Sequence, residues 1–321
     1  MRMGNGKWKI ILNFSEVLCV WNGIFLELLK AFYQNIFWCI IPSMKADLHI
    51  HSNNSDGSDA VQELLNNLKE SGVDIFALTD HDTVEGCKEM EKLAPKDITF
   101  IKGVELTCLC GDIKCHILGY GVDINNPDLS ALIEKGKLLR RQKLETRIQY
   151  LKDVFNIELT EDEKNWLYSR KSVVKTHLAN ILVNRGLADN NVSAMKKYLD
   201  NIKTGNTRFD GREAIETIKK AGGIVVWAHP IGGEGEKHLT LEEFLPKLEK
   251  MKTFGIQGLE CYYSRYDFDE IKFLTKCAED NNMLITGGSD YHGTNKNIPI
   301  LRLNTSDTPI DASKLTLLKC L

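Results

Sequence analysis

Short apolar segments typical of buried strands alternate with amphipathic helices through most of this chain. Strand patterns occur at residues 45–51, 73–82, 98–122, 223–230, 255–263 and 283–293. The pattern at 98–122 predicts a hairpin that turns at Gly111. The first helical pattern covers 58–72, where Ser58 or Asp59 is a typical cap and Gly72 a typical stop. Strands alternating with helices predict a parallel sheet with helical crossovers, either open and doubly wound or closed into a barrel.

Titratable side chains recur at the carboxyl ends of the predicted strands. His49 and His51 lie two residues apart on the first strand, so both point to the same side. Six of the eight histidines fall at such ends. Because these ends meet at one mouth of an α/β barrel, we expect the side chains to converge. The candidate metal ligands are His49, His51, Asp56, His81, Glu105, His116, His229, Asp290 and His292.

The composition of this set indicates which metals it binds. Imidazole mixed with carboxylate, without thiolate, suits Mn²⁺, Fe²⁺ or Zn²⁺. The ligands outnumber the coordination positions of one four-coordinate ion, so two or three ions are expected. Glu105 is the best candidate for a carboxylate that bridges two of them. A surplus of ligands favours open coordination positions, and therefore chemistry, over a closed structural site.

Two segments differ from the alternating pattern. Strand signals vanish over 124–206, which predicts a helical insertion within a domain made of 44–123 and 207–321. Residues 1–43 are predicted to lie outside the fold, as an extension from an upstream start site. An apolar stretch in this extension is interrupted by Glu27 and Lys30, so a membrane span is not favoured. A membrane-associating helix and an additional structural element stay open as alternatives.

The net charge and the cysteines limit the expected binding partners and cellular compartment. The formal net charge is -3, which does not indicate a protein coated with basic residues for stable nucleic-acid binding. The nine cysteines contain no CxxC pair, which favours reduced thiols and a cytoplasmic protein. Membrane contact is expected only through residues 1–43, and the pattern does not indicate an oligomeric state.

Six motifs together resemble one protein family. They are "DLHIHSNNSDGS" (47–58), "ALTDHDT" (77–83), "GVELT" (103–107), "CHILGY" (115–120), "WAHP" (227–230) and "GGSDYHG" (287–293). Their types and order resemble the PHP (polymerase and histidinol phosphatase) superfamily. The resemblance covers residues 45 to about 310. It implies a distorted seven-stranded (β/α)7 barrel that holds a trinuclear metal site, here with a helical insertion domain.

The resemblance also implies a ligand set for each ion. The first ion has His49, His51, Glu105 and Asp290; the second has Glu105, His116 and His229; the third has Asp56, His81 and His292. Asp56 stands where many histidinol-phosphate phosphatases have a histidine. With the insertion, this departure favours the branch that removes the 3'-phosphate of nucleoside 3',5'-bisphosphates or trims short RNA from its 5' end. Asp47 and Asp80 are expected to orient ligating imidazoles.

The activity implied is hydrolysis of a phosphate ester by metal-bound hydroxide. The catalytic residues are then Glu105, which bridges two ions, and His229 or Asp290, either of which could protonate the leaving oxygen. The substrate is a small nucleotide or a short RNA. Two alternatives stay open: a histidinol-phosphate phosphatase, and a PHP module that binds without catalysis.

Four further residues are candidates for substrate contact. Arg140 and Arg147 lie seven residues apart on one predicted helix and so share a face, which is either a solvated basic face or a grip for phosphate. The resemblance suggests a phosphate contact for His177; the alternative is a helix-start histidine packed against solvent. Arg265 follows a strand end, and phosphate contact and a surface position are both open for it.

Overall fold

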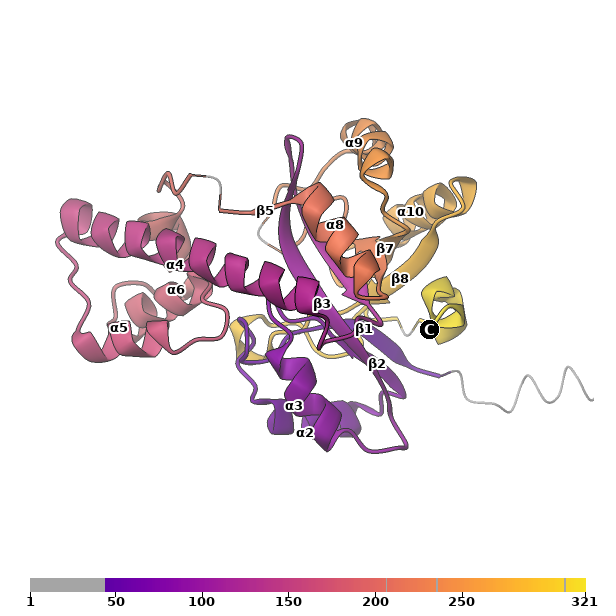
Figure 1. Cartoon of the computed structure of the whole chain (residues 1–321), viewed down its shortest axis with the longest axis horizontal. Helices are drawn as coiled ribbons and strands as arrows, with labels where there is room; N and C mark the ends of the chain where they lie inside the picture. Colours follow the sequence, from indigo (N-terminus) through magenta and orange to yellow (C-terminus); the bar gives the residue numbers. More distant parts are fainter. Residues whose placement is uncertain (1–43, 206, 235, 309) are drawn as a thin grey trace, which may run out of the picture. The chain divides into compact units, whose positions relative to one another are not determined.

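One mixed sheet forms the centre of the molecule (Figure 1). The structure is a computed structural model that describes residues 44–205, 207–234, 236–308 and 310–321. The strands are β1 (Ala46–Ile50), β2 (Ile75–Leu78), β3 (Thr99–Cys110), β4 (Ile113–Tyr120), β5 (Phe209–Asp210), β6 (Ile224–Trp227), β7 (Gly258–Tyr263) and β8 (Leu284–Gly288). The order β1-β2-β3-β4-β6-β7-β8 is interrupted by no other strand, and β5 pairs with β3 outside this path.

The two edges of this seven-strand path meet. Ile50 at the end of β1 forms a parallel bridge with Tyr291 just after β8. The amide of Asp290 donates to the carbonyl of His49 over 2.9 Å. The sheet is therefore a nearly closed barrel, which confirms the predicted barrel over the open alternative.

The predicted hairpin at the middle of the barrel is confirmed. Gly111 has φ 66°, in the left-handed region that a tight hairpin turn requires. β4 consequently runs antiparallel to both β3 and β6, whereas the other neighbours on the path are parallel. This one reversal distorts the barrel from a regular parallel one.

Among the residues that the structure describes, five helices lie against the barrel strands and five helical segments form the insertion. The first group is α2 (Val61–Ser71), α3 (Glu85–Leu93), α8 (Gly211–Lys220), α9 (Leu241–Phe254) and α10 (Phe268–Asp280). The second is α4 (Pro127–Phe155), α5 (Glu161–Tyr168), α6 (Lys175–Asn184), α7 (Asn191–Ala194) and the π-helix η1 (Met195–Leu199). Short 3₁₀ turns are η2 (Gly293–Asn295), η3 (Ala312–Lys314) and η4 (Thr316–Lys319).

In helix α2 the predicted end is confirmed and the predicted start is not. α2 ends at Gly72, which has φ 68°, as predicted. Its N-cap is Ala60 and makes no side-chain cap bond, so the prediction of Ser58 or Asp59 was wrong. Both residues have other partners: Ser58 accepts from the amide of Thr294, and Asp59 accepts from the hydroxyl of Tyr291.

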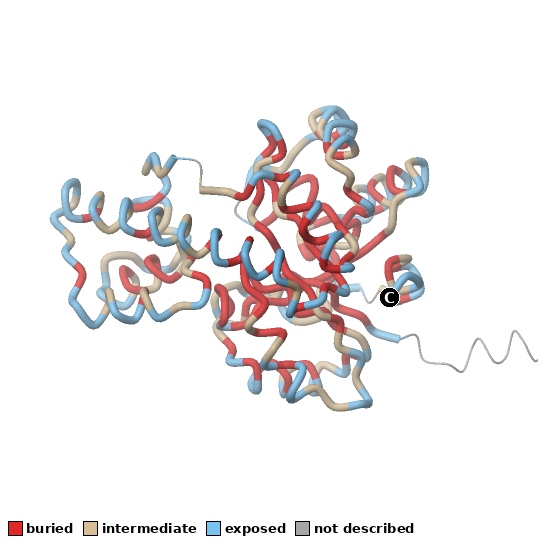
Figure 2. The backbone as a smooth tube through the Cα atoms, viewed as in Figure 1, coloured by how far each residue is buried: buried red, intermediate tan, exposed pale blue. Residues whose placement is uncertain are grey.

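Helix α4 belongs to two hydrophobic cores (Figure 2). It begins at Pro127 behind the cap Asn126, whose side chain accepts from two helix amides. Leu129, Leu132 and Ile133 pack into the barrel core. Leu144 and Leu151, further along, pack into the separate core of the insertion. The helix therefore packs against both the barrel and the insertion.

The predicted extension, residues 1–43, lies outside the described residues. Residues 44–321 form a compact unit of their own. None of the helices that the structure describes is long and apolar enough to cross a membrane.

Candidate metal centre

The carboxylate of Glu105, near the middle of β3, lies close to imidazole groups at the ends of β1 and β2. Its Oε2 lies 3.2 Å from Nε2 of His49 and 3.2 Å from Nε2 of His51, which both come from the end of β1. The same oxygen lies 3.1 Å from Nδ1 of His81, directly after β2. Three imidazole nitrogens therefore face one carboxylate oxygen.

The other oxygen of Glu105 faces a second set of imidazoles. Its Oε1 lies 3.0 Å from Nδ1 of His116 on β4 and 3.3 Å from Nε2 of His229 after β6. A carboxylate whose two oxygens face different ligand sets could bridge two ions. The bridging role of Glu105 stays a prediction.

Two aspartates complete the cluster from opposite sides. Oδ1 of Asp290, after β8, lies 3.6 Å from Nε2 of His49 and 3.3 Å from Nε2 of His51. Oδ1 of Asp56, in the loop after β1, lies 3.2 Å from Nε2 of His292 and 3.8 Å from Nδ1 of His51. The structure thus brings all nine predicted ligands together. Seven of them lie at or after the carboxyl ends of strands, whereas Glu105 lies near the middle of β3 and His116 within the antiparallel strand β4, so the predicted strand-end position was wrong for these two.

Several of these atoms are buried without a hydrogen-bond partner among the described residues. They are Nε2 of His49, His51 and His292, Nδ1 of His81, Oδ1 of Asp56 and Oε2 of Glu105. Leaving such atoms unpaired is costly unless something else satisfies them. Ligands bound to one ion at about 2.1 Å lie about 3.0–3.4 Å apart, close to the separations at Glu105. The residues present therefore fit metal ions.

Within the described part of the chain, three overlapping groups have atoms close enough to hold one ion each. They are His51, Asp56, His81 and His292; His49, His51 and Asp290; and His81, Glu105 and His116. In these groups His51 and His81 each occur twice, whereas the family resemblance gave each to one ion. His229 stands outside the third group, although it contacts the same oxygen of Glu105 as His116 does.

The imidazoles keep the central carboxylate ionised. Burial alone raises the pKa of Glu105, but His81, His49 and His116 outweigh it and hold this pKa well below 4.5. The pKa of Asp56 is lowered in the same way, against burial, by His292 and His81. Both carboxylates are therefore anionic at neutral pH, as metal ligands must be.

Glu260, on β7, is a supporting residue that the sequence analysis missed. Its Oε1 lies 2.8 Å from Nδ1 of His49, and its Oε2 accepts from the amide of His229 at 2.7 Å. It is fully buried. A carboxylate on the outer nitrogen of a ligating histidine fixes the ring so that the other nitrogen faces the metal. The only signal in the sequence is a lone charge inside the apolar strand "GLECYY".

Asp290 has two partners that sequence reasoning also missed. The hydroxyl of Tyr263 donates to Oδ2 of Asp290 at 2.8 Å, and Nζ of Lys296 donates to the same oxygen at 2.7 Å. These bonds leave Oδ1 facing the histidines of β1. Glu236, another missed carboxylate, lies 3.5 Å from Nδ1 of His229.

Asp47 makes no hydrogen bond to a described imidazole ring, so that prediction was wrong for it, whereas Asp80 is linked to the ring of His51 only through the hydroxyl of Ser55. Asp47 accepts from the amides of Ser289 and Leu301. Asp80 accepts from the amide and hydroxyl of Ser52 and from the hydroxyl of Ser55. Their carboxylates satisfy the amides and hydroxyls of the loops around the site, which would otherwise be buried unpaired.

The backbone is strained at three strand ends of the site. Asp82, His229 and Asp290 have φ values of 51°, 29° and 57°, in the left-handed region that side chains other than glycine disfavour. Strain of this kind persists where the surrounding structure enforces it, commonly at functional sites. Here it turns the chain sharply after β2, β6 and β8.

Arg140 and His177 lie beside the metal centre. Arg140 forms an ion pair with Asp82, the residue after His81, and donates to the hydroxyl of Thr107 at 2.9 Å. The ring of His177 lies near Asp56 and the backbone of Ser55, and burial lowers its pKa to about 4. His177 is therefore neutral at pH 7. Both side chains connect the insertion to the ligand-bearing loops.

Arg147 and Arg265 lie elsewhere. Arg147 is two turns beyond Arg140 on α4, among other cations. Nη1 of Arg265 donates to the backbone carbonyls of Gly233 and Glu236. This geometry favours a role in holding the loop that carries Glu236, and gives no support to a phosphate contact for Arg265.

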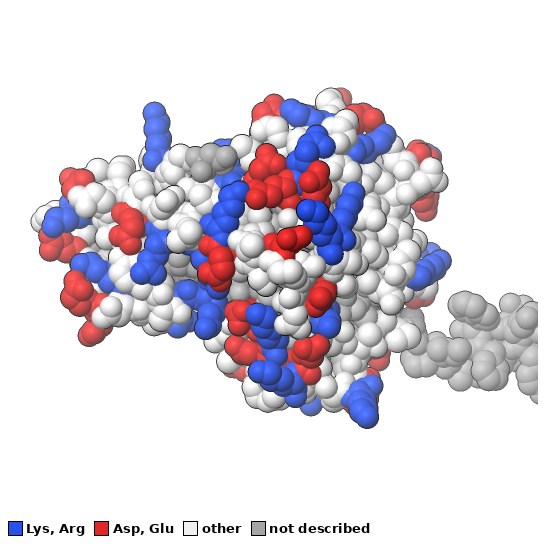
Figure 3. All heavy atoms as spheres, viewed as in Figure 1, with Lys and Arg blue, Asp and Glu red and all other residues white. Residues whose placement is uncertain are grey.

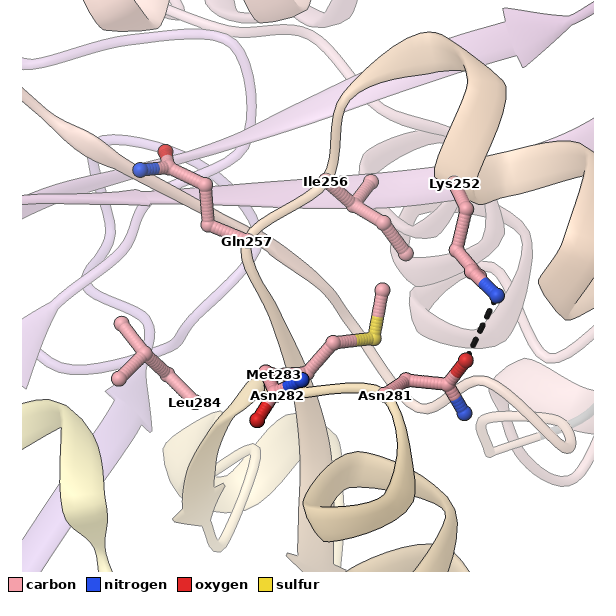
Figure 4. A pocket seen from close by; sticks show the side chains of 7 residues that line it. All are labelled: Lys252, Ile256, Gln257, Asn281, Asn282, Met283 and Leu284. Carbon is pink, nitrogen blue, oxygen red and sulfur yellow. Dashed lines mark hydrogen bonds between the residues drawn. The ribbon is translucent and has the colours of Figure 1, made fainter.

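A pocket far from these residues lies at the other end of the strands (Figure 4). It is lined by Lys252, Ile256, Gln257, Asn281, Asn282, Met283 and Leu284. Ile256 and Gln257 precede β7, and Asn282 and Met283 precede β8. The pocket is therefore at the amino ends of the strands, where α/β barrels do not carry their chemistry.

A nearly closed α/β barrel with histidines and carboxylates gathered at its carboxyl ends defines the class of metal-binding barrel proteins. Comparison with known proteins narrows this class. The family model for the PHP domain matches residues 47–220. The chain belongs to the PHP family, whose members are metal-dependent.

Two relatives and one solved structure are similar over most of their length. A 5'-3' exoribonuclease of Haemophilus influenzae is 32% identical over 253 residues, which cover 77% of this chain and 90% of that protein. A 3',5'-nucleoside bisphosphate phosphatase of Chromobacterium violaceum is 29% identical over 255 residues, covering 77% and 86%. The structure of a protein from Bifidobacterium adolescentis covers 87% of this chain and 96% of its own, with a TM-score of 0.72 at 24% identity. That last likeness shows the fold alone.

Proposed function

We propose that this protein is a metal-dependent phosphoesterase that acts on nucleotides. It removes the 3'-phosphate of nucleoside 3',5'-bisphosphates and trims short RNA from the 5' end. The observation that carries the proposal is the convergence of imidazoles on both oxygens of Glu105. The names of the two relatives, an exoribonuclease and a bisphosphate phosphatase, support the substrate class.

Nine residues would hold two to three ions, with Mn²⁺ preferred over Zn²⁺ or Fe²⁺. They are His49, His51, Asp56, His81, Glu105, His116, His229, Asp290 and His292. Bound ions would lower the pKa of a water molecule and neutralise charge on the phosphate oxygens. Glu105 would keep two ions adjacent, and His229 or Asp290 would protonate the leaving oxygen.

The residues around the ligands have positioning roles in this proposal. Glu260 fixes the ring of His49 and the backbone of His229. Tyr263 and Lys296 orient the carboxylate of Asp290. Arg140 and His177 place the insertion against the loops of the metal centre, where they can meet a bound phosphate.

The domain division also stays a proposal. We assign 44–123 and 207–321 to the barrel and 124–206 to an insertion that covers the site. The separate insertion core supports it. The first turns of α4 pack into the barrel core, so the start of the proposed insertion is anchored on the barrel.

A substrate panel tests the proposed activity. Protein loaded with Mn²⁺ is assayed with adenosine 3',5'-bisphosphate, a 5'-phosphorylated RNA trinucleotide and histidinol phosphate. We expect phosphate release from the bisphosphate and mononucleotide release from the RNA. Turnover of histidinol phosphate alone would overturn the nucleotide assignment. No turnover of any substrate by metal-loaded protein would favour a non-catalytic binding module.

A further inference from the structure

Three cysteine side chains lie on one face of the hairpin formed by β3 and β4. Cys108 and Cys110 are two residues apart on β3, and Cys115 on β4 is the register partner of Cys108. All three are buried in the hydrophobic core of the barrel. Successive side chains of a strand point to opposite faces, so the thiol of Cys115 points away from the imidazole of His116 beside it.

The thiols of Cys110 and Cys115 contact each other. The thiol of Cys115 donates to Sγ of Cys110 over 3.6 Å. The buried thiols of Cys87 and Cys261 instead donate to backbone carbonyls. A thiol held against a carbonyl behaves as a small buried side chain, whereas two thiols in contact can be joined by an oxidant.

The surroundings of Cys110 favour its reactive form. Gly211, the first residue of α8, packs so closely over Cys110 that a Cβ at this glycine would overlap Sγ. The amino end of a helix favours negative charge nearby. The hydrogen bond from Cys115 holds the pKa of the Cys110 thiol below its usual value of 9.0, against the opposing effects of burial and Asp210. The thiolate is the form that reacts with peroxides.

The turn that follows Cys110 reaches solvent. Gly111 and Asp112 are exposed. The hairpin extends to the top of the view in Figure 1, where charged side chains of both signs lie at the surface (Figure 3). Because Cys110 directly precedes this turn, a local opening of the hairpin end lets a small oxidant reach its sulfur.

A bond between the two sulfurs would strain the hairpin. Cys110 pairs with Ile113, and Cys108 pairs with Cys115, so Cys110 and Cys115 are diagonal neighbours. Diagonal neighbours have Cα atoms about 7–8 Å apart, whereas a relaxed disulfide joins Cα atoms about 5.5–6 Å apart. Closing the bond therefore requires β4 to shift relative to β3. Strained disulfides are easily reduced again, as regulatory ones are.

This shift would reach the metal centre through one residue. His116 directly follows Cys115, and its Nδ1 lies 3.0 Å from Oε1 of Glu105. Metal ligands must keep their distances to the ion within about 0.2 Å. A shift of β4 large enough to close the disulfide would therefore disturb the contact between His116 and Glu105.

We propose that Cys110 and Cys115 form a reversible disulfide that lowers the metal affinity of the site. The oxidant is hydrogen peroxide. The thiolate of Cys110 attacks it, which gives a sulfenic acid and one water molecule. The sulfur of Cys115 then forms the S–S bond and displaces the sulfenic oxygen as a second water molecule. Two thiols are oxidised by two electrons in total, and the peroxide is reduced to water. Only the effect on turnover rests on the proposed function.

Peptide mapping tests the disulfide itself. Full-chain protein loaded with Mn²⁺ is treated with hydrogen peroxide, its remaining thiols are blocked with iodoacetamide, and it is digested with trypsin. Cleavage after Lys114 separates Cys110 from Cys115, so their disulfide links the peptides 103–114 and 115–135. We expect the linked pair in the wild type and in Cys108→Ser, the matched control from the same buried face. Dithiothreitol should abolish it.

Cys110→Ser and Cys115→Ser should not form the linked pair. Two variants are used because either one alone could fail to fold. No linked pair in the oxidised wild type would overturn the proposal. A pair that persists in Cys110→Ser and is lost in Cys108→Ser would overturn it as well, since Cys108 would then be the partner of Cys115.

Metal content and turnover test the consequence. After oxidation the wild type should hold fewer Mn²⁺ ions per chain, and its kcat/KM for adenosine 3',5'-bisphosphate should fall by at least about tenfold. Dithiothreitol should restore both values, and the two serine variants should keep the values of the reduced wild type. Full disulfide formation with unchanged metal content would overturn the control of the site. Metal content decides this even if the protein hydrolyses no nucleotide.

Discussion

A single carboxylate on β7 positions two candidate ligands at once. Glu260 contacts the ring of His49 with one oxygen and the backbone of His229 with the other. In both contacts the carboxylate is the hydrogen-bond acceptor. The backbone N–H of His229 donates to one oxygen, and a donating Nδ1–H of His49 leaves Nε2 of that ring free to bind a metal. Glutamine at this position can satisfy only one of them.

Glu260→Gln should therefore weaken Mn²⁺ binding by roughly tenfold to a hundredfold. Titration calorimetry on the metal-free protein measures this directly. Glu249→Gln, whose carboxylate is exposed and paired with Lys252, is the matched control and should bind as the wild type does. Unchanged affinity in Glu260→Gln would show that the carboxylate does not support the metal ligands.

Lys143 makes the stability of the protein depend on pH. Burial and the neighbouring arginines lower its pKa to about 7 from the model-peptide value of 10.5. Between these two values the unfolded chain binds more protons than the folded protein, so this group makes the unfolding free energy rise with pH. Below pH 7 the full cost of the buried charge is present.

Urea unfolding at pH 7, 8 and 9 tests this expectation. Lys143→Met should exceed the wild type in stability most at pH 7, and the difference should shrink as pH rises. A constant difference across these pH values would mean that Lys143 keeps an ordinary pKa.

At the scale of elements, the close approach of β1 and β8, called the seam below, determines whether the site assembles. His49 lies on β1, and Asp290 lies two residues after the end of β8. A Cβ added at Gly288 would lie 2.4 Å from the backbone nitrogen of His49, closer than any real contact allows. The two strands can approach only because Gly288 has no side chain.

Gly288→Ala should force the strands apart and destabilise the protein by about 1–3 kcal/mol. It should also weaken metal binding, because His49 and Asp290 would separate. Thermal unfolding with and without Mn²⁺ measures both effects. A wild-type melting temperature would indicate that the seam is looser than the structure shows.

The elements follow from local patterns, whereas the supporting residues depend on distant partners. Gly72 and the hairpin at Gly111 were predictable because a left-handed backbone position favours glycine. Seven of the nine ligands were predictable in position because the carboxyl ends of strands converge, whereas Glu105 and His116 lie within β3 and β4. Glu260 was not, since its partner lies 211 residues away in sequence. The role of Asp47 was predicted wrongly because strand alternation indicates to which side of the sheet a side chain points, but not which group it contacts.

At the scale of the whole molecule, residues 44–321 form a compact unit that contains every candidate ligand. We therefore expect protein that begins at Met44 to fold and to hydrolyse the bisphosphate with the kcat/KM of the full chain. Parallel assays of the two proteins measure this. A loss of more than tenfold in the shorter protein would show that residues 1–43 contribute to the active enzyme.

The central claim is that Glu105 bridges metal ions that the hydrolysis of a phosphate ester requires. The most direct measurement determines the metal content per chain by mass spectrometry, together with phosphate release from adenosine 3',5'-bisphosphate, for the wild type and Glu105→Gln. We predict two to three Mn²⁺ ions and turnover in the wild type, and at most one ion without turnover in the variant. Wild-type metal content and turnover in Glu105→Gln would contradict the account.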